Sequence, residues 1–176
     1  IAEYKYDGER IQAHKKGDQI TLFSRRLEDI TDQYPDGREL VKKHVRVEGA
    51  IIEAECVAID TDTGEMKPFQ ELMHRRRKYG IKKAMEEYPI SLFMFDALYV
   101  DGKDLTLEPY PIRRQHLEKI IEKTDRVKVA EYIITDNPEE LEKFFEKAVE
   151  NGCEGLVCKS VNEDSVYQAG ARGWLW

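Results

Sequence analysis

Apolar and polar residues along the chain follow two periods, one typical of strands and one typical of helices. Residues 19–24 (Gln-Ile-Thr-Leu-Phe-Ser) alternate between the two kinds, as a half-buried strand does. Residues 90–100 are almost all apolar, which predicts a strand buried on both faces. Asp7-Gly8 predicts a tight turn between the first two strands, and residues 61–65 predict a hairpin loop. Together the strand-like runs occupy residues 1–6, 10–15, 19–24, 50–60, 90–100 and 154–160.

Helical periodicity is clearest after Asn137, a good N-cap that precedes a proline at the first helical position. Apolar side chains then recur at helical spacing up to Gly152, and they are Leu141, Phe144, Phe145, Ala148 and Val149. A second helix is predicted over residues 111–123, with a stripe formed by Ile112, Leu117, Ile120 and Ile121. Shorter helices are predicted at residues 35–44, 68–75 and 81–87.

Because strands and helices do not alternate regularly, the sequence predicts an α+β fold with largely antiparallel β-sheets flanked by helices. The 176 residues suit one domain. No run approaches the roughly 18 apolar residues of a membrane span, and no secretory leader is recognisable. The three cysteines form no paired-cysteine motif, so we expect no disulfide framework and a cytoplasmic location, or a nuclear one in a eukaryote. A net charge of −7 disfavours a stand-alone nucleic-acid binder but permits a local basic cleft.

Lys5 lies between two tyrosines at the end of the first predicted strand, beside the Asp7-Gly8 turn. A lysine is a nucleophile only when it is neutral, and burial or nearby cations lower its pKa. Arg10 lies just beyond the turn and could supply such a charge or contact a phosphate. By itself, this short motif fits a solvated lysine on a surface hairpin at least as well.

Two further segments place charged residues on apolar strands. Glu53 and Glu55 share one strand face, about 7 Å apart, and need a metal, a ribose hydroxyl or a cation unless that face is solvated. Simple alternation puts Glu154 and Lys159 on opposite faces. They can serve one pocket only if Glu154 precedes the regular strand or a bulge intervenes; otherwise they are the charged ends of a strand.

Three other features have both a functional and a structural interpretation. Arg25, which follows a strand, could bind phosphate or ribose, or could simply be solvated. The basic run at residues 74–78 could contact a nucleic-acid backbone, although a solvated surface is the commoner role of such a run. Phe93 and Phe95 alternate in the apolar strand, where core packing is the default, but an aromatic ring there can also stack on a base.

In this order, the motifs resemble those of ATP-dependent DNA ligases of the archaeal and eukaryotic type. The resemblance covers residues 1–176 and implies the ATP-grasp-like nucleotidyltransferase fold that DNA ligases share with mRNA capping enzymes. Residues 68–78 are specifically similar to DNA ligases. The matching segments are residues 5–10 (K-x-D-G-x-R), Phe23-Ser24-Arg25, Glu53-Ala54-Glu55, residues 95–102 (F-D-x-L-Y-x-x-G) and residues 154–159 (E-G-x-x-x-K).

This resemblance implies a mechanism in which Lys5 attacks the α-phosphorus of ATP and forms lysyl–AMP. AMP would then pass to the 5′-phosphate of a nick in double-stranded DNA, and the 3′-hydroxyl would displace it. The resemblance also implies Mg²⁺, held by Glu55 and Glu154. It implies nucleotide contacts by Glu3, Lys5, Arg10, Arg25, Glu55, Phe95, Lys159 and Arg172.

The family's K-x-K motif, its N-terminal DNA-binding domain and its C-terminal OB domain do not occur within these 176 residues. We therefore expect the adenylation core of a longer protein, monomeric and weak or inactive alone. Any sliding-clamp contact would lie outside it. The alternatives are an RNA ligase, a GTP-using mRNA capping enzyme and a non-catalytic nucleotide-binding module. Base preference and the segment at residues 68–78 distinguish the first two from a DNA ligase.

Overall fold

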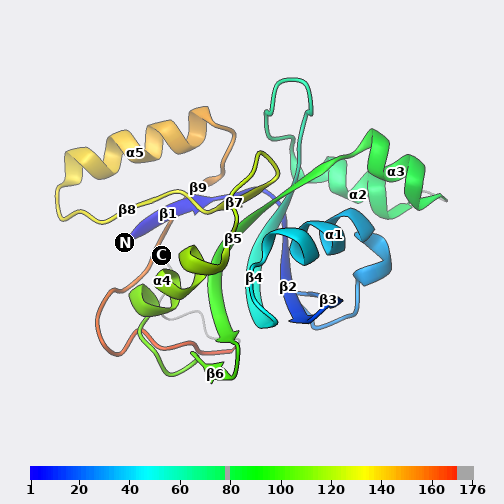
Figure 1. The fold of residues 1–176 in the computed structure, drawn as a ribbon. Coiled ribbons are helices and arrows are strands. Elements are labelled where there is room, and N and C mark those ends of the chain that lie inside the picture. The colour runs from blue at the N-terminus through cyan, green and yellow to red at the C-terminus, as the bar shows by residue number, and fades with distance from the viewer. Residues whose placement is uncertain (78–79, 170–176) are drawn as a thin grey trace.

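The computed structural model describes residues 1–77 and 80–169, and it contains two sheets (Figure 1). The larger sheet has the order β3-β2-β4-β5-β6, with β7 paired to β5, and the smaller sheet has the order β8-β1-β9. All strand pairs are antiparallel except β5 with β7. The strands are β1 (Ala2–Lys5), β2 (Glu9–Lys16), β3 (Gln19–Ser24), β4 (Gly49–Ala58), β5 (Ile90–Val100), β6 (Lys103–Asp104), β7 (Val127–Val129), β8 (Tyr132–Ile133) and β9 (Gly155–Cys158).

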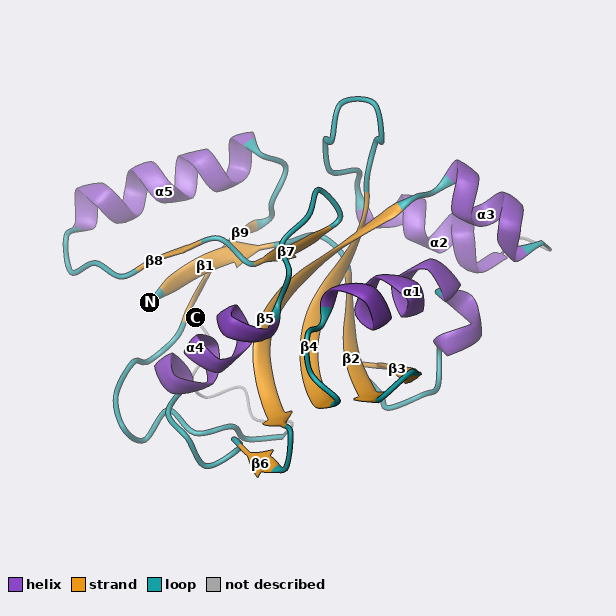
Figure 2. Ribbon diagram, viewed as in Figure 1, coloured by secondary structure: helices purple, strands orange, loops and turns teal. Residues whose placement is uncertain are grey.

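The helices lie outside the two sheets, as Figure 2 shows. Helix α1 contacts β2, β3 and β5, α4 lies along β5, and α5 covers β1 and β9 of the smaller sheet. No helix in the described part of the chain is both long and apolar enough to cross a membrane. The helices are α1 (Pro35–His44), α2 (Phe69–Arg77), α3 (Ile81–Glu87), α4 (Tyr110–Ile120) and α5 (Pro138–Glu150), with a short 3₁₀ helix η1 (Thr31–Gln33).

Two apolar clusters hold these layers together. The first includes residues of β2, β3, β4 and β5 and of helices α1 and α4, and among its fully buried side chains are Leu22, Ile52 and Leu117. The second lies at the smaller sheet and includes Tyr6 and Phe93. The rings of Tyr6, just after β1, and Phe93, in β5, stack with their centroids 4.0 Å apart. This stack joins the smaller sheet to the larger one.

The structure confirms the predicted α+β class and most of the predicted elements. The runs at residues 19–24 and 90–100 are β3 and β5, and the helices at 35–44 and 81–87 are α1 and α3, with the predicted bounds. Asn137 caps α5 by accepting a hydrogen bond from the Glu139 backbone N–H at 2.9 Å. Residues 61–65 form the expected loop, because Ile59 and Met66 pair across it.

The chain bends at Asp7-Gly8 between the first two strands, but these strands do not form a hairpin. β1 and β2 do not pair with each other, and these two residues carry the chain from the smaller sheet to the larger one. Asp7 is anchored there because its Oδ2 accepts the Phe69 backbone N–H at 3.0 Å. A Cβ atom at Gly8 would lie 2.4 Å from the carbonyl oxygen of Cys56, so this crossover passes too close to β4 for any side chain.

Both long helices differ from their predicted apolar stripes. Helix α4 ends at Ile120 because Ile121 is extended and pairs with Val45. It also buries Arg113 and Arg114 at 4% and 3% exposure, although arginines are expected to face water. In α5 only Ala148 of the predicted stripe is fully buried, whereas Phe145 and Val149 are 46% and 48% exposed.

Neither interpretation of the basic run at residues 74–78 holds for Arg75. Its side chain is 3% exposed and pairs with the buried Asp36 of α1. Arg75 also donates to the Tyr88 carbonyl oxygen at 2.9 Å and lies over the Tyr34 ring. Arg75 therefore ties α2 to α1 inside the protein.

Candidate active site

Lys5 stands at the end of β1 with its side chain 52% exposed, and its ammonium pairs with the carboxylate of Glu154. In the β1–β9 register, Lys5 is opposite Gly155, the first residue of β9. Glu154 thus precedes the regular strand. This is one of the two arrangements in which the sequence allowed Glu154 and Lys159 to serve one pocket. Gly155 has φ +147°, a conformation that few other residues adopt, and this sets the direction in which β9 leaves Glu154.

Arg10 and the two glutamates of β4 lie on one face of the larger sheet. Arg10 is paired with Glu55 in the β2–β4 register and Gln12 with Glu53. The side chain of Glu53 is 3% exposed and forms an ion pair with Arg10. Its Oε1 also accepts from Gln12 Nε2 at 3.2 Å and from the Tyr167 hydroxyl at 3.1 Å. The buried carboxylate of Glu53 therefore has a cation, Arg10, as its partner. A cation was one of the three kinds of partner that the sequence analysis considered for the glutamates of this strand.

Burial raises the pKa of Glu55 from 4.5 to about 7. The charges of Arg10, Lys5 and Arg25 oppose this rise, and that of Asp7 adds to it. Glu55 consequently senses the charges of Lys5 from β1, of Arg10 from β2 and of Arg25, which is exposed just after β3. These four predicted site residues, which come from four separate segments, belong to one electrostatic site.

Glu3 lies two residues before Lys5 on the same face of β1, and its side chain is 3% exposed. Its carboxylate accepts hydrogen bonds from Arg114, the Tyr110 hydroxyl and Lys159, the last at 2.5 Å. Lys159 comes just after β9 and also donates to the Tyr110 hydroxyl at 2.9 Å. Glu3 and Lys159, both predicted as nucleotide contacts, are therefore direct partners.

Sequence reasoning did not assign Tyr110 and Arg114 to the site. The available signal was the pair Arg113-Arg114 inside the helical stripe of α4, where both arginines fall on the buried side. A buried arginine needs a carboxylate partner. Arg113 has Asp96 at 2.8 Å, and Arg114 has Glu3.

The two alternating phenylalanines of β5 have different surroundings. Phe93 is 6% exposed and packs against Tyr6, which confirms its default assignment to the core. Phe95 is half-buried, and the Lys159 ammonium lies 5.0 Å from its ring centroid. Phe95 therefore borders the charged site, whereas Phe93 belongs to the joint between the sheets.

The donor set around Lys5 fits a magnesium ion that completes its shell with phosphate oxygens and water. Glu154 pairs with Lys5, and Glu55 interacts with the same ammonium. Two carboxylates are what Mg²⁺ commonly takes from a protein when it binds together with a nucleotide. Within residues 1–77 and 80–169 no group of three or more potential metal ligands occurs. Arg172 lies outside the described residues.

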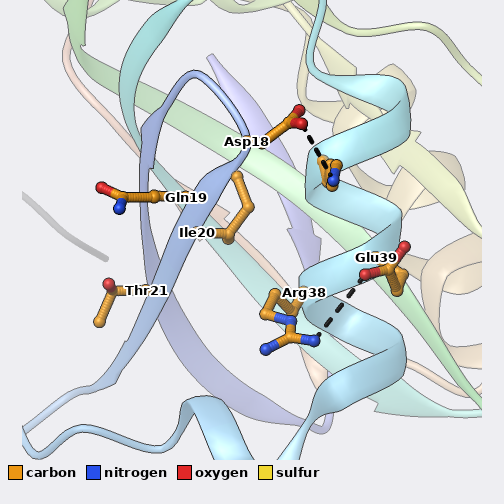
Figure 3. Close-up of a pocket in the computed structure, with 7 residues that line it drawn as sticks. Asp18, Gln19, Ile20, Thr21, Arg38 and Glu39 are labelled. Carbon is orange, nitrogen blue, oxygen red and sulfur yellow. Dashed lines mark ion pairs between the residues drawn. The ribbon is translucent and has the colours of Figure 1, made fainter.

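A separate surface pocket of about 490 Å³ lies between β3 and α1 (Figure 3). Two ion pairs lie beside it, Lys42 with Asp18 at 3.3 Å and Arg38 with Glu39 at 3.9 Å. None of its lining residues belongs to the site around Lys5. They are Asp18, Gln19, Ile20, Thr21, Arg38, Glu39 and Lys42.

The sequence is similar to those of known DNA ligases. The chain is 60% identical to a DNA ligase of Sulfophobococcus zilligii and 58% identical to one of Hyperthermus butylicus, and it is matched over its full length in both. It covers only 29% of each of these relatives.

Solved structures show the same fold. The ligase domain from M. tuberculosis LigD has a TM-score of 0.76 at 27% identity, covering 99% of this chain and 52% of that one. A mycobacterial DNA ligase D complexed with ATP and MES has a TM-score of 0.71 at 26% identity, covering 96% and 50%. The family described as ATP dependent DNA ligase domain matches residues 1–176. The chain therefore belongs to the family of ATP-dependent DNA ligase domains.

Proposed function

We propose that this chain carries out the nucleotide-charging step of a DNA ligase, with Lys5 as the nucleophile. The observation that carries the proposal is the placement of Lys5. Its exposed ammonium pairs with the carboxylate of Glu154, and its charge, like that of Arg10, acts on the carboxylate of Glu55. A nucleophile, carboxylates and cations in one site are what transfer of a nucleotidyl group requires.

In the proposed step, the neutral amine of Lys5 attacks the α-phosphorus of ATP. A nitrogen–phosphorus bond forms, the bond to the bridging oxygen of the β-phosphate breaks, and pyrophosphate leaves with the electron pair. The exposed Lys5 ammonium first gives one proton to solvent water, and the amine loses a second proton to water as the nitrogen–phosphorus bond forms. The Lys5 nitrogen is engaged in the ion pair with Glu154, so this pair must open before the attack.

The other predicted residues surround this reaction. Arg10, Arg25 and Lys159 neutralise charge on the phosphates, while Phe95 offers a ring on which the base stacks. Glu3 contacts the base, Glu55 contacts the ribose, and Arg172 adds a further contact to the nucleotide. When bound, Mg²⁺ would be held by Glu55 and Glu154 and would neutralise further phosphate charge.

The substrate that follows ATP is a nick in double-stranded DNA. AMP passes from Lys5 to the 5′-phosphate, and the 3′-hydroxyl then displaces AMP and seals the strand. Support for DNA as the substrate comes from the relatives, which are DNA ligases with 58–60% of the residues in common. This chain covers 29% of the length of each of these relatives.

The proposal is tested by measuring the intact mass after incubation with Mg²⁺ and either ATP or GTP. The unaltered chain should gain one AMP, and Lys5→Ala should gain none. Lys16→Ala is the matched control, because Lys16 is an exposed lysine at the end of β2 and should leave labelling unchanged. An adduct on Lys5→Ala would exclude Lys5 as the nucleophile. An added GMP would instead indicate a capping-type enzyme.

A further inference from the structure

The carboxylate of Glu3 is the buried centre of a charged cluster that links α4 to the smaller sheet. Glu3 and Arg114 have side chains that are each 3% exposed. Lys159, the third charged member, is 13% exposed and pairs with Glu3 Oε2 at 2.5 Å. Of these three charges, the one that reaches nearest to solvent is that of Lys159.

Arg114 is held in place by both terminal nitrogens of its guanidinium group, while its buried Nε has no hydrogen-bond partner in the described part of the chain. One terminal nitrogen donates to Glu3 and the other to the carbonyl oxygen of Ala130. The group lies 4.1 Å from the ring centroid of Tyr132, and its Nε lies 3.4 Å from Glu118. A guanidinium group stays protonated in proteins, so Arg114 provides a fixed positive charge next to Glu3.

Tyr110 completes the cluster without changing its charge. Burial and the neighbouring Glu3 carboxylate raise the pKa of Tyr110 well above its ordinary value, so the hydroxyl keeps its proton. That hydroxyl accepts from Lys159 at 2.9 Å and lies within 2.9 Å of the Phe95 carbonyl oxygen. Tyr110 thereby orients the Lys159 ammonium toward the side of the site where Phe95 lies.

Glu3 and its two cationic partners carry a surplus of one positive charge. The charge of Asp96 also acts on Lys159, but Asp96 is already paired with Arg113. Glu3 contributes one negative charge, while Arg114 and Lys159 contribute one positive charge each. Glu118 adds little, because its carboxylate is 36% exposed and screened by water. We propose that Arg114 is a positioning residue, which neutralises Glu3 and so leaves the charge of Lys159 available to a nucleotide phosphate.

This inference rests on the proposed function, in which Lys159 neutralises charge on the nucleotide phosphates. It makes Arg114 necessary for tight ATP binding even though Arg114 is buried. Without Arg114, Glu3 and Lys159 would neutralise each other and the ammonium would be held by its carboxylate partner. Removing the charge of Glu3 as well should release Lys159 again.

The neighbouring Arg113 offers a matched control on the same helix. It is 4% exposed, pairs with the buried Asp96, and donates to the carbonyl oxygens of Glu108 and Ser165. None of its hydrogen-bond partners is Glu3 or Lys159. A substitution at Arg113 therefore reproduces the structural loss of a buried arginine without removing a hydrogen bond of Glu3 or Lys159, and within the Glu3 cluster it changes only the contact of Arg113 with the Tyr110 ring at 5.3 Å.

The experiment measures ATP affinity by calorimetry and AMP labelling by intact mass in R114Q, R114K and R113K. Each Arg114 variant is also made in the E3Q background. R114Q should weaken ATP binding about tenfold when Glu3 is present and less than about twofold when residue 3 is glutamine. R114K keeps a positive charge and should lose less affinity than R114Q. R113K should lower the thermal midpoint without changing ATP affinity.

Two results would overturn the inference. One is an equal loss of ATP affinity on replacing Arg114 in the Glu3 and E3Q backgrounds, and the other is a loss in R113K that matches that of R114K. If R114Q does not fold, the same comparison is made with R114K. A parent chain that neither binds ATP nor takes up AMP would instead refute the proposed function itself, so the two failures are distinguishable.

Discussion

At the residue scale, the ionised carboxylate of Glu55 lowers the stability of the folded protein. Its carboxylate lies largely out of water, and this burial raises its pKa to about 7 even though Arg10, Lys5 and Arg25 favour the ionised form. The nearby cations therefore do not fully compensate the desolvation of Glu55 in the nucleotide-free protein. A metal ion bound at this carboxylate would supply positive charge there.

Replacing Glu55 by glutamine should stabilise the fold at neutral and higher pH. The pKa of Glu55 rises on folding from 4.5 to about 7, so ionisation weakens the folded parent as the pH rises through this window. The advantage of Glu55→Gln in free energy of unfolding should be smallest below pH 4.5 and grow by up to about 3 kcal/mol above pH 7. Urea titrations across this pH range measure it.

Glu142→Gln on α5 is the control for this prediction, because Glu142 is exposed to solvent. Its effect on the free energy of unfolding should vary little over the same pH range, since its carboxylate stays in water. A Glu55→Gln variant whose advantage does not grow with pH would show that Glu55 is not desolvated in the folded protein.

The sequence was informative about the residues that carry the chemistry and uninformative about those that hold them. Lys5, Arg10, Glu55 and Glu154 lie in short motifs, and the structure brings their charges together. The role of Arg114 depends on Glu3, which lies 111 positions away in the chain. No local pattern records such a pairing, and arginine in a helix normally indicates the solvent face.

At the scale of the elements, the crossover at Asp7-Gly8 sets the distance between Lys5 and Arg10. Lys5 is the last residue of β1 in the smaller sheet, and Arg10 is the second residue of β2 in the larger sheet. The backbone at Gly8 runs against β4, where a Cβ atom would meet the Cys56 carbonyl oxygen at 2.4 Å and the Glu55 Cγ at 2.9 Å.

Gly8→Ala should therefore destabilise the fold by about 1–3 kcal/mol, because the backbone of β4 or of the crossover must move. It should also slow AMP labelling, since the same movement shifts Lys5 relative to Arg10. Gly49→Ala provides the control, because its added Cβ atom would make only an ordinary contact with Tyr99 at 3.5 Å. Equal urea midpoints for the two variants would contradict the close approach at Gly8.

Element prediction succeeded where periodicity extends over many residues and failed for short strands. β6, β7 and β8 contain two or three residues each, too few for alternation to be recognised. Their formation depends on partners elsewhere, as when β8 pairs with β1. Similarly, the stripe of α5 predicted which side chains are apolar, but the narrow smaller sheet leaves Phe145 and Val149 almost half exposed.

At the scale of the whole molecule, the site lies where the two sheets meet, and each sheet supplies part of it. The smaller sheet brings Lys5 and Glu3, and the larger sheet brings Arg10 and Glu55. The stack of Tyr6 on Phe93 joins the sheets beside these residues. Strand β5 thus has one phenylalanine in the joint and, two positions later, another at the site.

Substitutions of the two phenylalanines of β5 should affect different properties, one the free energy of unfolding and the other the affinity for nucleotide. Phe93→Ala removes the stacking contact with Tyr6 and should lower the free energy of unfolding by about 3–5 kcal/mol. Phe95→Ala should chiefly weaken nucleotide binding, by about 1–3 kcal/mol, if the base stacks on its ring. Urea denaturation and ATP-binding calorimetry on both variants make the comparison. Unchanged ATP affinity in Phe95→Ala would assign Phe95 to packing alone.

The pairing of β1 with β9 has a consequence for the protein during its synthesis. Lys5 and its partner Glu154 are separated by 149 positions. A ribosome adding about 5–20 residues per second needs roughly 7–30 s to translate that interval. Strand β8 is translated only at residues 132–133 and β9 only at residues 155–158, so for most of this time β1 lacks both of its neighbouring strands. Nascent chains of this length are therefore exposed to chaperones and to aggregation before any nucleotide can be bound.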